Sequence, residues 1–330
     1  MLHIHNGDST AGTAKKASIP GEHLAWREAL VCGPVPGGLS ADAFRRVRAE
    51  HLASAYGVSI EKCEQELRKQ EDALSAFSAH EEVVLWFEHD LFCQVQLIYL
   101  LDWFAQRELG STKLSLVCIG EFPGIEYFRG LGQLNEAQLA SLFPQRQEVS
   151  ESQLQLGSKA WQAYSSPNPA DLLSLMALDL SAMPFLERAF TKHLQRFPST
   201  ENGLGRIGNV GLGLIARGYQ RFRSLFPAFV SRESEYGFGD AQLYLELKQL
   251  AKAPAPLLTL SSTVKGRSTD AAEMLLSTFV LTDVGRAVLD GKEDFVRRNG
   301  IDAWVGGVHL QGNESDYRWE EQAHELLARL

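Results

Sequence analysis

Val83-Val84-Leu85-Trp86-Phe87-Glu88-His89-Asp90 is the stretch from which we predict the fold. It opens with five consecutive apolar residues, a pattern typical of a strand that is buried on both faces. An apolar helix pattern follows directly, over residues 91–104. The last three residues of the stretch are ionisable and lie where a strand passes into a helix. Ligands of open α/β sheets bind at this edge, so the stretch predicts both a sheet and a site.

Other strand patterns lie on both sides of this stretch. We expect further strands at residues 2–5, 23–29 and 113–119, and helices at residues 40–56 and 60–77. A turn over residues 6–12 and a brief helix over residues 13–18 should follow the first strand. Strands that alternate with helices predict an α/β fold with a Rossmann-like parallel sheet. We place this domain at residues 1–145.

The rest of the chain has a different pattern. Residues 146–196 are expected to form a helical connector packed on the first domain. Residues 197–330 are expected to form a smaller α+β domain. Its order of helix (240–251), two strands and short helix (283–289) also fits a winged-helix-like domain.

Composition limits the classes of function. The chain has 330 residues, of which 45% are hydrophobic and 22% are charged, as is usual for a soluble globular protein. The formal net charge is −9. Residues 1–195 hold 16 basic and 24 acidic side chains, and residues 196–330 hold 16 and 17. Neither part has the basic excess of a dedicated nucleic-acid binder, so we expect no nucleic acid as the main partner.

The four cysteines and the N-terminal residues bear on location. No two cysteines have CxxC spacing, which argues against a zinc site or a redox dithiol. The first residues lack the basic and apolar regions of a signal peptide, and no apolar run approaches the ~18 residues of a membrane span. We therefore expect a cytoplasmic protein with reduced thiols and no membrane partner.

Eight blocks of the sequence resemble a known family. They are Leu2–Ser9, Trp26–Leu30 with Gly33–Pro36, Val84–Leu91, Leu116–Glu121, Phe197–Ser199, Asn202–Leu204, Leu281–Asp283 and Trp304–Leu310. They look like blocks of a bacterial family of unknown function, with an N-terminal domain of the type called domain of unknown function 1835. The resemblance implies no particular activity.

Two positions depart from the family pattern. Relatives tend to carry an aspartate where this chain has Cys93, which weakens a metal-site interpretation that needs that carboxylate. Relatives often have a polar, helix-turn-helix-like stretch where this chain has the glycine-rich residues 205–211. Glycine disfavours helix, so this departure argues against DNA binding.

Polar residues follow each expected strand of the first domain, and we expect them to meet at one edge of the sheet. They are Asn6, Gly7, Asp8, Ser9, Arg27, Glu28, Glu88, His89, Asp90 and Glu121. Such a set can perform acid/base chemistry, bind a divalent metal or hold a polar ligand. The alternative is that each residue only caps a helix or turns a loop.

Several smaller signals bear on the same site. The turn at residues 6–12 could hold a phosphate on backbone N–H groups, although Asp8 would repel it and no standard phosphate-binding motif is matched. His89 lies between two carboxylates in the sequence, which should favour its protonated form if they are close in space. Gln94 and Gln96 lie in the apolar helix, and Gln94 is one turn from Asp90.

Two histidine motifs remain. His3 and His5 alternate along the first strand and could bind a metal or simply pack. The segment Trp304–Leu310 has a glycine pair that could fold back over the first domain and bring His309 to the site, or form a turn in the second core.

These patterns predict an enzyme, or at least a small-molecule binder, that takes a nucleotide or another phosphorylated polar ligand. Hydrolysis or group transfer is the expected chemistry. His89 is the expected acid/base, Asp8, Glu88 and Asp90 are expected to orient the ligand or bind a divalent metal, and Arg27 is expected to pair with an anion. The other expected ligand-binding residues are Asn6, Gly7, Ser9, Glu28, Gln94, Glu121 and His309. The rival hypotheses are a nucleic-acid-binding or regulatory protein that uses the C-terminal domain, and a non-catalytic assembly protein.

Overall fold

A computed structural model describes residues 1–262 and 271–328 of the chain. Its N-terminal half is built on one five-stranded sheet with the strand order β2-β1-β3-β4-β5. Four strands are parallel and the short edge strand β5 is antiparallel to β4. The strands are β1 (Leu2–Asn6), β2 (Glu22–Trp26), β3 (Glu82–Glu88), β4 (Lys113–Ile119) and β5 (Gln147–Glu148). The predicted mixed α/β fold is confirmed.

The central strand β3 explains why the sheet is covered on both faces. Successive side chains of a strand point to opposite faces. Val83, Leu85 and Phe87 pack in the larger apolar core, whereas Val84 and Trp86 pack in a second, smaller one. All five side chains are fully buried. The uninterrupted apolar run is thus the sequence signature of a strand between two layers of helices.

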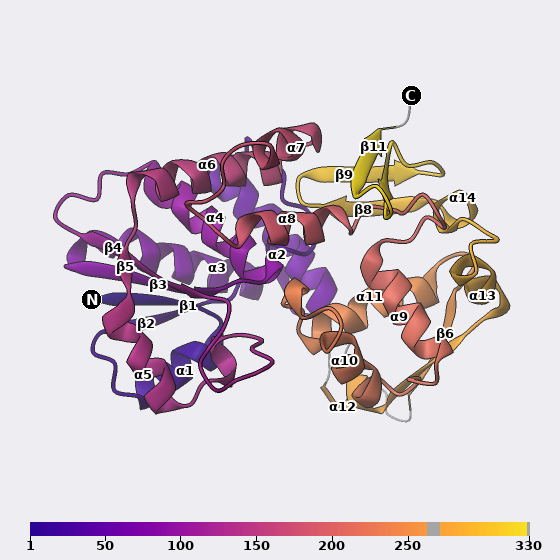
Figure 1. Cartoon of the computed structure of the whole chain (residues 1–330), viewed down its shortest axis with the longest axis horizontal. Helices are drawn as coiled ribbons and strands as arrows, with labels where there is room; N and C mark the ends of the chain where they lie inside the picture. Colours follow the sequence, from indigo (N-terminus) through magenta and orange to yellow (C-terminus); the bar gives the residue numbers. More distant parts are fainter. Residues whose placement is uncertain (263–270, 329–330) are drawn as a thin grey trace.

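Helices cover both faces (Figure 1). Helices α1 and α5 lie on one side of the sheet, and α4 and α6 lie on the other. The helices of this half are α1 (Asp8–Lys16), α2 (Ala41–Tyr56), α3 (Ile60–Ser75), α4 (Leu91–Ala105), α5 (Glu136–Leu142) and α6 (Glu151–Ser165). Because β1 leads into α1 and β3 leads into α4, the chain leaves neighbouring strands toward opposite faces. The gap between the carboxyl ends of β1 and β3 is therefore where ligands bind in open sheets of this kind.

The C-terminal half combines short helices with small antiparallel sheets. Its helices are α7 (Ala170–Met176), α8 (Leu186–Leu194), α9 (Arg206–Ala216), α10 (Phe222–Val230), α11 (Asp240–Lys252), α12 (Ala271–Leu276), α13 (Asp283–Leu289) and α14 (Phe295–Asn299). Its strands form the pairs β6 (Leu258–Ser262) with β7 (Ser277–Leu281), β8 (Ile301–Val305) with β9 (Val308–Gly312), and β10 (Tyr317–Glu320) with β11 (Glu325–Ala328). No helix in the described part of the chain is both long and apolar enough to cross a membrane.

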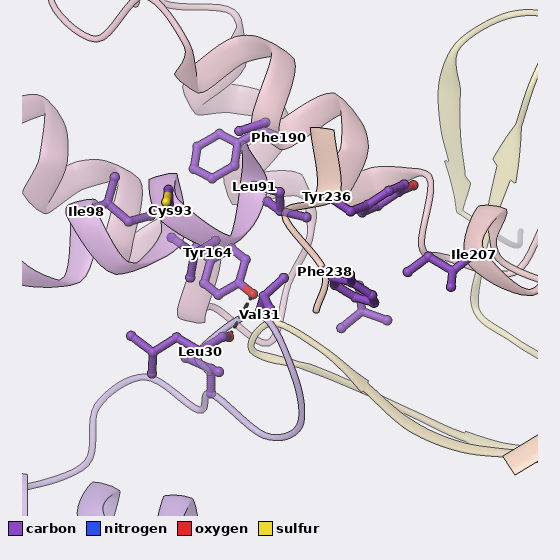
Figure 2. Packing of buried hydrophobic residues seen from close by; sticks show 14 of the residues in the cluster. Leu30, Val31, Leu91, Cys93, Ile98, Tyr164, Phe190, Ile207, Tyr236 and Phe238 are labelled. Atoms are coloured by element: carbon purple, nitrogen blue, oxygen red, sulfur yellow. Dashed lines mark hydrogen bonds between the residues drawn. The ribbon is translucent and has the colours of Figure 1, made fainter. Parts of the chain in front are cut away.

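The two halves share one continuous apolar core. The larger cluster of buried residues includes Leu2 and Leu85 of the sheet and also Leu247 and Trp319 of the C-terminal half. Figure 2 shows Tyr236 and Phe238, from the C-terminal half, beside Leu91 and Val31. The position of one half is therefore fixed by apolar packing on the other.

The glycine pair predicted to form a tight turn joins β8 to β9. Gly306 has φ +63°, a backbone conformation that favours glycine. The Gly307 N–H donates to the Tyr164 carbonyl at 2.9 Å, and the Gly306 carbonyl accepts from the Val35 N–H at 3.2 Å. The turn thus contacts the first domain directly at the loop before α2, and it also contacts α6.

One local prediction was wrong. Residues 6–12 are not an extended turn, because Gly7, with φ 90°, makes the turn alone and α1 begins at Asp8. Most of the glycine-rich residues 205–211 belong to helix α9. Tertiary packing overrides the low helix propensity of glycine there: Gly211 is buried, and a β-carbon on it would lie 2.7 Å from Leu247.

Candidate functional site

Three acidic side chains are buried together where β3 passes into α4. One ligand atom from each of Glu88, Asp90 and Cys93 lies within 4.8 Å of the other two. We call these three residues the carboxylate cluster. None of the three is more than 8% exposed, so water screens their mutual repulsion little.

Glu88, the last residue of β3, is held by short contacts. Its Oε2 accepts from the Cys93 thiol at 2.7 Å, and its Oε1 accepts from the Leu131 N–H. Gly130, beside Leu131, comes so close that a β-carbon there would lie 2.8 Å from the Glu88 carboxyl carbon. The loop before α5 therefore closes over this carboxyl group.

Asp90 has a structural role as well as a place in the cluster. It caps α4, because its Oδ1 accepts from the Cys93 N–H at 2.9 Å. Gly237, in the segment between α10 and α11, covers it from the C-terminal half. A β-carbon on Gly237 would collide with Asp90 Oδ1. The cluster is thus closed by one loop from each half of the chain.

Three amides fix the surroundings of the cluster. Asn6, at the end of β1, donates to Cys93 Sγ at 2.6 Å, and its Oδ1 accepts from Gln96 at 2.8 Å. Gln96 also donates to the Glu28 carbonyl, and Gln94 donates to the Glu88 carbonyl at 2.6 Å. The amides tie the ends of β1 and β3 to α4 and to the chain after β2.

Burial alters the acidity of the whole cluster. Burial and the Glu88 carboxylate raise the pKa of Asp90 to about 8. Burial also raises the pKa of Glu88 and raises that of the Cys93 thiol well above its usual value. Among the described residues, no lysine, arginine or histidine forms an ion pair with any of the three. Near neutral pH the cluster therefore retains a proton or requires a cation.

Glu28, also expected in the site, is buried but paired. Its carboxylate accepts from Arg48 of α2 at 2.7 Å, and Arg48 also donates to three backbone carbonyls. The guanidinium is fully buried. This pair fixes the segment after β2 to α2. The sequence patterns did not identify Arg48 as the partner of Glu28.

Asp8 and Arg27 meet each other at the surface. The Arg27 guanidinium donates to both Asp8 oxygens, at 2.7 and 2.8 Å. Their side chains are 67% and 51% exposed, respectively. Ser9 is also exposed. These residues lie at the expected edge but outside the buried carboxylate cluster.

His89 was expected to be protonated only if the two carboxylates lay close to it, and that condition is not met. Burial and the nearby Arg188 lower its pKa, and the backbone of Ile119 opposes them only in part. Its ring contacts Phe128 and Phe185 rather than a carboxylate, and its Nδ1 is buried without a hydrogen-bond partner in the described chain. Its neighbours in the sequence, Glu88 and Asp90, are directed into the cluster instead.

The remaining candidates lie elsewhere. Glu121 is exposed after β4. His309 lies on β9, where it stacks on Trp304 and bonds to Asp302 at 2.6 Å. The β8–β9 turn contacts the first domain, but His309 takes its partners from its own hairpin.

The histidines of β1 belong to a packed array with His23 of β2. His3 Nε2 bonds to the Pro20 carbonyl at 3.1 Å, and Trp86 donates to His3 Nδ1 at 3.1 Å. His5 Nε2 and His23 Nδ1 lie 2.9 Å apart. Burial lowers the pKa of His3 to about 4 and that of His5 to about 2, so both are neutral packing groups.

The sequence did not predict which segments cover the carboxylate cluster. Two segments that cover the cluster contribute no polar side chain that would identify them in the sequence. They are the loop at Gly130 and Leu131 and the segment at Gly237. Gln96 carried a usable signal, because a polar amide in the middle of an apolar helix needs a buried partner.

Comparison with known proteins adds no family. No protein-family model matches the chain, and no curated protein matches it.

Proposed function

We propose that the chain binds a small phosphorylated or otherwise polar ligand, such as a nucleotide, at the carboxyl ends of β1 and β3, and catalyses its hydrolysis or group transfer. The observation that supports this most is the carboxylate cluster. Burying two carboxyl groups beside each other without a basic partner is costly, and such arrangements are typical of functional sites. The strand order, which supports a Rossmann-like assignment, puts the cluster where such folds bind ligands.

The roles of the residues follow from their acidity and position. A carboxyl group with a pKa near neutrality is suited to general acid/base catalysis, which makes Asp90 the better candidate than His89. A divalent cation bound by Glu88, Asp90 and Cys93 would displace the protons that the cluster retains, compensate the resulting negative charge and attract a phosphate.

The surface residues supply the anion-binding part of the proposal. The N-terminus of α1 is not capped by a side chain, so its first N–H groups can meet a phosphate. The Arg27 guanidinium would then leave the Asp8 carboxylate and pair with the phosphate of the ligand. The resemblance to the bacterial family fits this proposal without adding an activity.

A thermal-shift screen tests the proposal. We would measure the melting temperature with nucleoside mono-, di- and triphosphates and sugar phosphates, each with and without Mg²⁺ or Mn²⁺. We expect at least one ligand to raise it, and we expect Glu88→Gln to abolish that shift. Glu81→Gln is the matched control, since Glu81 is an exposed carboxylate one residue before β3. The proposal fails if no ligand shifts the melting temperature, or if both variants respond like the wild type.

Nucleic-acid binding through a winged-helix-like C-terminal domain has less support. The elements α11, β6, β7 and α13 do occur in the required order. The nearby Arg206, however, is engaged by Glu233 at 2.7 Å and Glu321 at 3.0 Å. A gel-shift titration at low salt would detect this activity.

A further inference from the structure

A second cavity lies between the two halves of the chain and shares no residue with the carboxylate cluster. Its volume is about 840 Å³, which is within the range of small-molecule sites. Its wall includes α2, the N-terminal end of α9, one side of α11 and the β8–β9 hairpin. Cavities at domain interfaces are common places for ligand binding.

One wall carries a guanidinium group without a carboxylate partner. Arg196 follows α8 and lines the cavity. Its Nη1 is buried and has no hydrogen-bond partner, and Arg196 forms no ion pair within residues 1–262 and 271–328. Arg196 therefore places a positive charge on this wall that no carboxylate of the described chain pairs directly, and an anion in the cavity can bind it.

The facing helix α11 carries the opposite charge. Glu246 lines the same cavity and has no ion-pair or hydrogen-bond partner in the described part of the chain. Burial raises the pKa of Glu246, and Arg196 opposes this rise. Both residues line the cavity, and they do not form a direct ion pair with each other.

The other walls restrict the ligand further. Leu204, Ile207, Leu245 and Trp304 give the cavity an apolar lining. A purely apolar ligand would leave Arg196 and Glu246 without a direct partner. A molecule with one negative group, one positive group and an apolar body satisfies all three surfaces.

We propose that this cavity binds a small zwitterion of the amino-acid or short-peptide class, with its carboxylate on Arg196 and its ammonium group on Glu246. The apolar side chain of the ligand lies against Leu204 and Trp304. This site is additional to the proposed function at the carboxylate cluster and does not depend on it.

Calorimetric titration of the full chain tests this proposal. The probes are the twenty amino acids and a set of apolar dipeptides, followed by the N-acetyl and C-amide derivatives of the tightest binder. We expect at least one zwitterion to bind, and we expect each derivative to bind at least tenfold more weakly. Glu246→Gln should weaken the zwitterion at least tenfold and leave the N-acetyl derivative unchanged, because that derivative has no ammonium group.

Arg196→Gln gives the complementary result, a loss of affinity for the zwitterion and for the N-acetyl derivative. The matched controls are Arg223→Gln and Glu201→Gln, which change exposed residues outside the cavity. Should Arg196→Gln fail to fold, Glu246→Gln with the two derivatives still decides the question. The proposal is overturned if no probe binds, or if binding is equal in Glu246→Gln and the wild type.

Discussion

Two groups of buried carboxyls lie near the same edge of the sheet, and they differ in how their charge is compensated. Glu28 is paired with the fully buried Arg48, which also donates to three backbone carbonyls. Glu88 and Asp90 have only a thiol and backbone N–H groups. A buried carboxylate that has an arginine partner contributes to the stability of the fold. Two buried carboxyl groups without a basic partner instead retain a proton or bind a cation.

The largest expected effect is on the paired side of this comparison. Replacing Arg48 by Met leaves the Glu28 carboxylate buried and alone, which should lower the free energy of unfolding by about 3–5 kcal/mol. Urea denaturation would measure it. Arg46→Met is the control, because Arg46 makes only an exposed pair with Glu50 four residues on, worth about 0.3–0.5 kcal/mol. Equal losses in both variants would contradict our distinction between the two kinds of charge.

The carboxyl groups without a basic partner, Glu88 and Asp90, should make the free energy of unfolding depend on pH. The pKa of Asp90 is raised in the folded protein, so between about pH 4 and pH 8 the folded state holds a proton that the unfolded state has lost. Stability should therefore fall as pH rises through this window, by at most about 1.4 kcal/mol per pH unit for one group. Asp90→Asn keeps a good helix cap and removes the carboxyl.

Unfolding titrations at several pH values would compare the wild type with Asp90→Asn. We expect the wild type to lose stability relative to the variant as pH rises from 5 to 8. A constant difference between the two proteins would mean that Asp90 is not protonated in the folded state.

The smallest expected effect is at the exposed ion pair. Arg27→Gln breaks the pair with Asp8, which should cost about 0.2–1 kcal/mol because water surrounds both groups. The loss should shrink further in 1 M salt, where the Debye length is about 3 Å. Parallel urea denaturation at low and high salt would check this, and a loss above 2 kcal/mol would show that the pair supports the fold after all.

The sequence predicted the sheet well because its signals are local. The apolar run at residues 83–87 needs helices on both faces, and the structure provides them. The start of α1 was predicted too late in the chain, because a single glycine with φ 90° makes the turn that was expected to take residues 6–12. Helix α9 forms despite its glycines, and Gly211 allows close packing on Leu247 of α11.

The candidate site was harder to predict than the fold. The sequence indicated Glu88 and Asp90, since both flank a strand end. It could not show that His89 points away from them, because neighbours in the chain diverge at the start of a helix. Nor could it show that Arg48 compensates Glu28, since that contact spans 20 residues.

The close contact of Gly237 with Asp90 makes the two halves of the chain depend on each other. The burial that makes Asp90 a weak acid is provided in part by the C-terminal half. We expect a fragment of residues 1–196 to expose this carboxyl group to water and to return its pKa toward the ordinary range. The acidity of Asp90 in the first half thus depends on packing by the second half.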